Sequence, residues 1–109
     1  MALKVIVVGL GGRGRLWARE VAAEPGFELA AGVEPDAETR RRAATETGLG
    51  EARLYANLEE ALEQAECDAV AVVTPADRHV EACEAGLARG RRVLVEPDLL
   101  GFLAGFALA

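Results

Sequence analysis

Short apolar runs alternate with amphipathic helical patterns along this chain. The apolar runs, rich in β-branched residues, predict buried strands at Leu3–Val8, Phe27–Val33, 68–73 and Arg92–Val95, with a short strand near 53–56. Helices are predicted over 13–24, from the N-cap Asp36 to about Gly48, from the N-cap Asn57 onward, and over 76–89. This alternation predicts right-handed crossovers. The expected fold is therefore a doubly wound α/β domain, with five parallel strands in the order 3-2-1-4-5 between two layers of helices.

Apolar residues at helical spacing predict which face of each helix is buried. The helix over 76–89 carries Val80, Cys83 and Leu87 on one face, which predicts that this face contacts the sheet. The helix after Asn57 is expected to bury a stripe made of Leu58, Ala61, Leu62 and Ala65. Trp17 is expected to pack with Val21, one turn along its helix, in preference to covering a cofactor.

The turn after the first strand reads Gly9-Leu10-Gly11-Gly12-Arg13-Gly14 and matches the pattern G-x-G-x-x-G. The match is informative because it follows a predicted strand and opens a predicted helix. Gly9 is expected to form the tight turn, Gly11 to let the backbone approach a pyrophosphate, and Gly14 to let the helix lie against the sheet. The positive end of the helix would attract the pyrophosphate, and Arg13 and Arg15 could add cationic contacts. The segment predicts a dinucleotide site of the Rossmann type.

Glu34 ends the second predicted strand, 20 residues after Gly14. Its carboxylate can accept hydrogen bonds from the ribose hydroxyls of adenosine and would repel a 2′-phosphate, so NAD is favoured over NADP. Arg40, Arg41 and Arg42 oppose this preference, because any of them could reach a 2′-phosphate. The alternative is a solvated glutamate in front of a turn.

Composition narrows the class of protein further. The 109 residues, 51% of them hydrophobic, suffice for one compact domain. A net charge of −6 argues against nucleic acid or an anionic membrane as a partner, and no apolar run reaches the roughly 20 residues of a membrane span. Cys67 and Cys83 fit neither a disulfide framework nor a metal site, so we expect inert thiols, no metal and a cytoplasmic location.

One lysine stands against eleven arginines, and Asn57 and Gln64 are the only side-chain amides. Selection against labile amides in a thermophile would produce this bias. A GC-rich genome would produce it equally well, so both origins stay open.

The sequence resembles the N-terminal domain of the glucose–fructose oxidoreductase/inositol dehydrogenase (Gfo/Idh/MocA) family. The resemblance extends to about Leu100 and includes the glycine loop, ELAAGVEPDAE, YANLEEALEQAECDAVAVVTPADRH and ACEAGLARGRRVLVEPDLL. Its most specific part is Thr74-Pro75 followed by His79, because in the family the Thr-Pro turn lies beside the nicotinamide. The resemblance implies NAD(P)-dependent hydride transfer on sugars, polyols or related compounds. The cofactor site would then comprise the glycine loop, Glu34, Thr74 and Pro75.

Two departures from the family pattern bear on catalysis. The family usually reads Glu-Lys-Pro after the fifth strand, whereas this chain reads Glu96-Pro97-Asp98, and proline cannot polarise a reacting hydroxyl. The family's C-terminal substrate domain is also expected to be missing. His79 is then the only candidate proton-transfer group, and a place at the cofactor rim suits it better. We therefore expect a nucleotide-binding domain that is not competent alone, a non-catalytic interaction module, or a degenerate fragment.

The last segment, from Leu99 to Ala109, has no charged or polar side chain. We expect residues 1–98 to form the dinucleotide-binding domain and 99–109 an apolar tail. Such a tail should be buried, and the hypothesis we favour is a homodimer in which two tails meet. Packing of the tail on its own domain and a truncation remnant are the alternatives.

Overall fold

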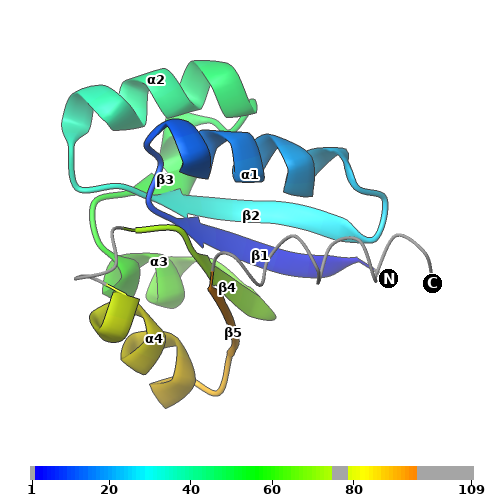
Figure 1. The fold of residues 1–109 in the computed structure, drawn as a ribbon, viewed down its shortest axis with the longest axis vertical. Coiled ribbons are helices and arrows are strands. Elements are labelled where there is room, and N and C mark those ends of the chain that lie inside the picture. The colour runs from blue at the N-terminus through cyan, green and yellow to red at the C-terminus, as the bar shows by residue number, and fades with distance from the viewer. Residues whose placement is uncertain (1, 75–78, 96–109) are drawn as a thin grey trace.

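Five parallel strands form one sheet in the part of the chain that the structure describes, and helices cover both of its faces (Figure 1). The computed structural model describes residues 2–74 and 79–95. Its elements are, in chain order, β1 (Leu3–Val8), α1 (Gly12–Ala23), β2 (Phe27–Val33), α2 (Ala37–Thr47), the 3₁₀ turn η1 (Glu51–Arg53), β3 (Leu54–Tyr55), α3 (Leu58–Gln64), β4 (Ala69–Val72), α4 (His79–Ala88) and β5 (Arg92–Val95).

The strand order is β3-β2-β1-β4-β5, and every neighbouring pair is parallel. Helices α1 and α2 lie over one face, and α3 and α4 lie over the other (Figure 1). The chain therefore reverses its direction of winding between β3 and β4, with β1 at the centre. The predicted fold class and strand order are confirmed. In sheets of this kind ligands bind outside the carboxyl ends of the strands, where the winding reverses.

Alternate residues of the central strand β1 fill two separate cores. Val5 and Val7 pack with Trp17 and Val21 beneath α1. On the other face, Ile6 and Val8 join a cluster that includes the predicted α3 residues Leu58, Ala61 and Leu62, with Ala65 partly buried against it. Burial on both faces explains why β1 reads as one continuous apolar run. Trp17 is a core residue, as expected from its spacing to Val21.

Two helices begin at the capping residues that the sequence predicts. The carboxylate of Asp36 accepts hydrogen bonds from the Thr39 backbone N–H at 2.9 Å and from the Thr39 hydroxyl at 2.7 Å. These bonds lower the pKa of Asp36 below its ordinary value. At the start of α3, the Asn57 side chain accepts from the Glu60 N–H at 2.9 Å. Each cap satisfies an N–H group that has no partner inside its helix.

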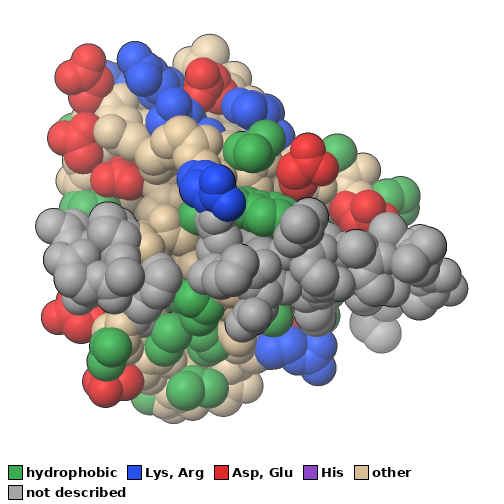
Figure 2. All heavy atoms as spheres, viewed as in Figure 1, with side chains coloured by type: hydrophobic (Ala, Val, Ile, Leu, Met, Phe, Trp, Pro, Cys, Tyr) green, Lys and Arg blue, Asp and Glu red, His purple; other side chains and the backbone are tan. Residues whose placement is uncertain are grey.

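The predicted buried face of α4 is wrong for Val80 and Leu87 and right for Cys83. Val80 and Leu87 are each 63% exposed, whereas Cys83 is half-buried and packs against the core on this side of the sheet. Ala82 and Gly86 face the sheet instead, and a methyl group at Gly86 would come within 2.9 Å of Val93 Cγ2. Small residues let α4 approach the sheet closely, and this geometry turns the bulky residues outward. Hydrophobic side chains are visible on the surface at the α4 end of the molecule (Figure 2).

The amino ends of β1 and β4 are joined by polar contacts. The Asp68 carboxylate accepts from the Lys4 backbone N–H at 2.9 Å, and the Lys4 ammonium pairs with Glu66 at 3.0 Å. Asp68 therefore links the starts of two neighbouring strands. Next to it, burial raises the pKa of the Cys67 thiol, which keeps the sulfur protonated and fits the expectation of an inert cysteine.

Candidate dinucleotide site

The turn from β1 into α1 is built on two glycines that no other residue could replace without strain. Gly9 has φ +94°, and a Cβ there would lie 3.0 Å from the backbone nitrogen of Thr74. A Cβ at Gly14 would lie 1.7 Å from the carbonyl oxygen of Gly9. The chain can therefore turn sharply between strand and helix, and α1 can begin directly against the end of β1. These are the structural roles that the spacing predicts for Gly9 and Gly14.

The first turn of α1 is open on its outer side. A Cβ built at Gly11 or Gly12 would meet no atom of the described residues within 4 Å. Gly11 is the N-cap residue, it offers no side-chain cap, and the first turn of α1 holds no acidic residue. Backbone N–H groups at such a helix start attract anions. Packing therefore does not explain why these two positions are glycines, whereas close approach of a ligand to the backbone does.

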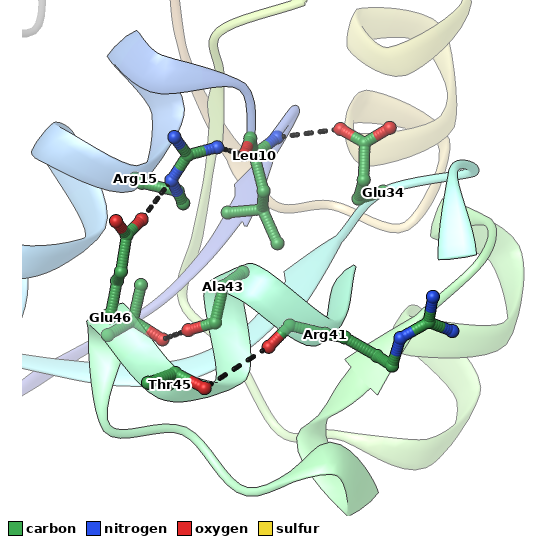
Figure 3. A network of polar contacts seen from close by, with 8 residues as sticks. Leu10, Arg15, Glu34, Arg41, Ala43, Thr45 and Glu46 are labelled. Atoms are coloured by element: carbon green, nitrogen blue, oxygen red, sulfur yellow. Dashed lines mark hydrogen bonds and ion pairs between the residues drawn. The ribbon is translucent and has the colours of Figure 1, made fainter. Parts of the chain in front are cut away.

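Glu34 lies beside this turn, at the carboxyl end of β2. Its Oε1 accepts a hydrogen bond from the Leu10 N–H at 2.9 Å, and its Oε2 accepts from the Asp36 N–H at 3.1 Å. Figure 3 shows the carboxylate directed at Leu10 of the glycine loop. Glu34 is thus held in place by backbone donors, which the sequence did not predict. A carboxylate has about four acceptor positions, so it can still accept from ribose hydroxyls.

Arg40 has a structural role that its place in the sequence does not predict. Its Nη1 donates to the backbone carbonyls of Glu34, at 2.8 Å, and of Pro35, at 3.0 Å. It thereby fixes the turn that follows β2. Arg41 and Arg42 are exposed on α2. Spacing alone gives no signal for such a contact, because an arginine can reach several carbonyls from one helix position.

A groove of about 620 Å³ lies at the carboxyl edge of the sheet, between the α3 and α4 starts. Val8, Val33 and Thr74 line it from the ends of β1, β2 and β4, and Pro35 lines it next to Glu34. Three glutamates also line it, namely Glu59, Glu81 and Glu84. The Thr74 hydroxyl oxygen is buried and has no hydrogen-bond partner among the residues that the structure describes. This groove is apolar next to Glu34 and reaches Thr74 at the end of β4, so it has room for a nucleotide ligand.

Some predicted site residues lie wholly or partly outside what the structure describes. Pro75 and the segment 96–109 belong to residues outside the description, and for His79 only the backbone is described, as the first residue of α4. Arg13 is exposed on the first turn of α1 and has an interaction of its own.

Within 2–74 and 79–95 no group of three or more His, Cys, Asp or Glu could hold a metal ion. No helix in those same ranges is long and apolar enough to cross a membrane.

Comparison with known proteins identifies the family. Residues 3–97 match the family model GFO_IDH_MocA, described as an oxidoreductase family with an NAD-binding Rossmann fold. The chain belongs to this family. The predicted resemblance to Gfo/Idh/MocA proteins and to their NAD-binding domain is confirmed. A search of curated proteins found no match to the chain.

Solved structures support the same assignment. The scyllo-inositol dehydrogenase from Lactobacillus casei with bound NAD(H) and scyllo-inositol has a TM-score of 0.79 and 25% identity, covering 91% of this chain and 29% of that one. GenD2 from gentamicin A biosynthesis, in complex with NAD, has a TM-score of 0.76 and 36% identity, covering 86% and 26%. A myo-inositol dehydrogenase from Corynebacterium glutamicum has a TM-score of 0.76 and 25% identity, covering 87% and 28%. The chain thus spans less than a third of these relatives.

Proposed function

We propose that the carboxyl edge of this sheet binds NAD, with the pyrophosphate over the first turn of α1. The observation that carries the proposal is the contrast among the glycines. Gly9 and Gly14 are required by backbone contacts, whereas a Cβ at Gly11 or Gly12 would meet none of the described residues. The N–H groups of Gly11, Gly12, Arg13 and Gly14 would then hold the pyrophosphate oxygens.

The adenosine half of the cofactor would occupy the groove beside Glu34. The Glu34 carboxylate would accept from the ribose hydroxyls, and Val8, Val33 and Pro35 would contact the base. The carboxylates of Glu59, Glu81 and Glu84 add negative charge to the same groove. We propose on these grounds that NAD binds more tightly than NADP, since a 2′-phosphate would be repelled. Arg40 counters this repulsion less than its position suggests, because it is bound to two carbonyls.

The nicotinamide half would lie beside Thr74 and Pro75, whose place in the chain matches the Thr-Pro turn of the family. The cofactor would supply hydride transfer there when bound. Two similar solved proteins are named as inositol dehydrogenases, which makes a polyol the proposed class of substrate. His79 is the proposed proton-transfer group or rim residue, and Pro97 at the family's lysine position argues against turnover by this chain alone.

A second candidate function is a nucleotide-binding interaction module, and the exposed Val80 and Leu87 on α4 favour it. The proposed homodimer through residues 99–109 and a cytoplasmic location fit either function. Turnover of NAD with polyols would support the dehydrogenase, whereas association that depends on nucleotide without turnover would support the module. A monomer mass by light scattering at micromolar concentration would exclude the dimer.

Thermal unfolding with NAD, NADH, NADP and no ligand tests the proposed binding. Ligand at about 100 times its Kd should stabilise the fold by roughly 2.7 kcal/mol, a rise in Tm of several degrees. Gly11→Val should abolish the shift and leave the unliganded Tm nearly unchanged, because the new side chain enters open space where the pyrophosphate would lie. Equal shifts in wild type and Gly11→Val would show that the glycine loop is not the site.

The NAD preference is tested at Glu34 with two variants. Glu34→Gln keeps one side-chain acceptor for the Leu10 N–H, loses the acceptor for the Asp36 N–H and removes the negative charge, so the affinity gap between NAD and NADP should narrow. Glu34→Ser should narrow the gap too, and it should also weaken NAD binding because the hydrogen bond to the loop is lost. An unchanged gap in both variants would show that Glu34 does not read the ribose.

A further inference from the structure

Leu10, the residue between the first two glycines of the loop, is anchored at three points. Its N–H donates to Glu34 at 2.9 Å, and its carbonyl accepts from Arg15 Nη1 at 2.9 Å. Its side chain is fully buried and occupies space that Gly32 leaves free, since a Cβ at Gly32 would come within 2.8 Å of Leu10 Cδ1. This loop residue is therefore fixed by β2 on one side and by α1 on the other.

Arg15 is itself held by the next helix. Its guanidinium forms an ion pair with Glu46 near the end of α2, and its side chain is only 14% exposed. Figure 3 shows the continuous chain of contacts from Glu46 through Arg15 to Leu10 and Glu34. Arg15 thus joins α2 to the glycine loop, and the guanidinium is engaged inside the protein. The sequence had suggested a cationic contact to the pyrophosphate instead.

The position of the Leu10 carbonyl determines where the Gly11 N–H points. The Leu10–Gly11 peptide is planar and trans, so its carbonyl and its N–H point in opposite directions. A carbonyl fixed by a charged donor therefore fixes the direction of the Gly11 N–H, the first donor of the open turn. Glycine at positions 11 and 12 leaves this backbone intrinsically free, so the anchor has to come from elsewhere.

We propose that Arg15 is a positioning residue for dinucleotide binding, which orients the Gly11 N–H through the Leu10 carbonyl and is itself oriented by Glu46. The inference rests on the proposed NAD site. A positioning role and a direct contact between Arg15 and the pyrophosphate predict opposite effects of removing Glu46 on NAD affinity. If Arg15 acted by its charge on the ligand, removal of the nearby negative Glu46 would strengthen NAD binding. If Arg15 acts by position, removal of Glu46 weakens it.

Calorimetric titration of NAD into the whole chain tests the proposal with three variants. Arg15→Met keeps the buried stem and removes the donor, and we expect NAD affinity to fall about tenfold, the scale of one lost charge-assisted hydrogen bond. Glu46→Ala should weaken binding in the same direction by a smaller factor. Arg19→Met removes the same charge from an exposed residue one turn further along α1, and NAD affinity should stay at the wild-type value.

A ligand without phosphate separates positioning from general damage to the fold. Binding of adenosine, followed by saturation-transfer NMR, should be unchanged in Arg15→Met while NAD binding weakens, and the ¹⁵N shift of the Gly11 amide should move. Stronger NAD binding by Glu46→Ala, or equal losses for adenosine and NAD, would overturn the proposal. Failure of the wild type to bind NAD at all would instead overturn the proposed function.

Discussion

Helices α1 and α4 both lie against the same sheet, but they meet it in different ways. Helix α1 approaches backbone to backbone at Gly14 and buries the bulky residues Trp17 and Val21. Helix α4 approaches through Ala82 and Gly86, against side chains of β4 and β5, and leaves its bulky residues in solvent. A stripe of bulky apolar residues therefore predicts the buried face of a helix only when those residues form the contact with the sheet. Where small residues form the contact, as on α4, the prediction fails.

The largest expected difference between the two helices comes from their contact glycines. Gly14→Ala should destabilise the fold by about 3 kcal/mol or more, because the new methyl group meets the carbonyl oxygen of Gly9, a residue whose N–H is bonded to Val33 of β2. Gly86→Ala meets a valine methyl group at 2.9 Å and gains helix propensity, so its stability should stay within about 1 kcal/mol of wild type. Urea unfolding of both variants measures the contrast, and equal losses would contradict it.

The next largest difference in stability should come from truncating a bulky side chain on each helix. Val21 is 2% exposed, and Val21→Ala should cost about 2 kcal/mol from lost burial and the cavity left behind. Leu87 is 63% exposed, so Leu87→Ala should change stability by less than about 0.5 kcal/mol. Urea unfolding gives both changes in stability from the shift in the transition midpoint, provided that the variants share the wild-type dependence of unfolding free energy on urea concentration. A loss above 1 kcal/mol for Leu87→Ala, on the scale of a buried residue, would show that this face of α4 is covered in solution.

On the α4 side of the sheet, variants of the α3 cap residue Asn57 test how much a local hydrogen bond contributes to stability. Asn57→Ala removes the acceptor for the Glu60 N–H and should cost about 1 kcal/mol. Asn57→Asp keeps an acceptor at the same position and should match the wild type at neutral pH. Thermal unfolding compares the three proteins, and similar losses in both variants would mean that the amide has another role.

The cap of α2, on the α1 side, should give the smallest effect, and the effect should depend on pH. The pKa of Asp36 is lowered in the fold by its bonds to Thr39, so its stabilisation is present above the ordinary value of 3.8 and is lost as pH falls through the lower folded value. Wild type and Asp36→Asn should therefore differ most near neutral pH and converge in acid. Melting curves from about pH 6 to about pH 2 check this, and a constant difference would contradict it.

Local patterns were enough to predict the strand order, the two caps and the roles of Gly9 and Gly14. Each of these depends on a run of neighbouring residues or on a backbone conformation that only glycine adopts easily. The contacts of Glu34 and Arg15 were not predictable in the same way. Arg15 reaches a carbonyl five residues back and a carboxylate on another helix, and no spacing in the sequence pairs residue 15 with residue 46.

On α4 the sequence predicted burial that the structure does not show. Val80, Cys83 and Leu87 form a regular apolar stripe, yet of these three residues only Cys83 packs against the core, because the close approach at Gly86 decides which way the helix turns. Packing distance to the sheet is a tertiary property, so periodicity alone could not give it. The same reasoning explains why Gly11 and Gly12, where an added Cβ would meet none of the described atoms, could be recognised only by their place in a motif.

Trp17 is the single tryptophan of the chain, three residues after Gly14 and 8% exposed. Its indole is therefore an intrinsic optical probe confined to one side of the sheet. Emission from a buried indole lies at shorter wavelength than emission in water, so a red shift would report that α1 has left its core. Detachment of α4 alone would leave the emission unchanged and appear only in circular dichroism. Two spectra recorded on one unfolding sample can thus show whether the two helices separate from the sheet together or in turn.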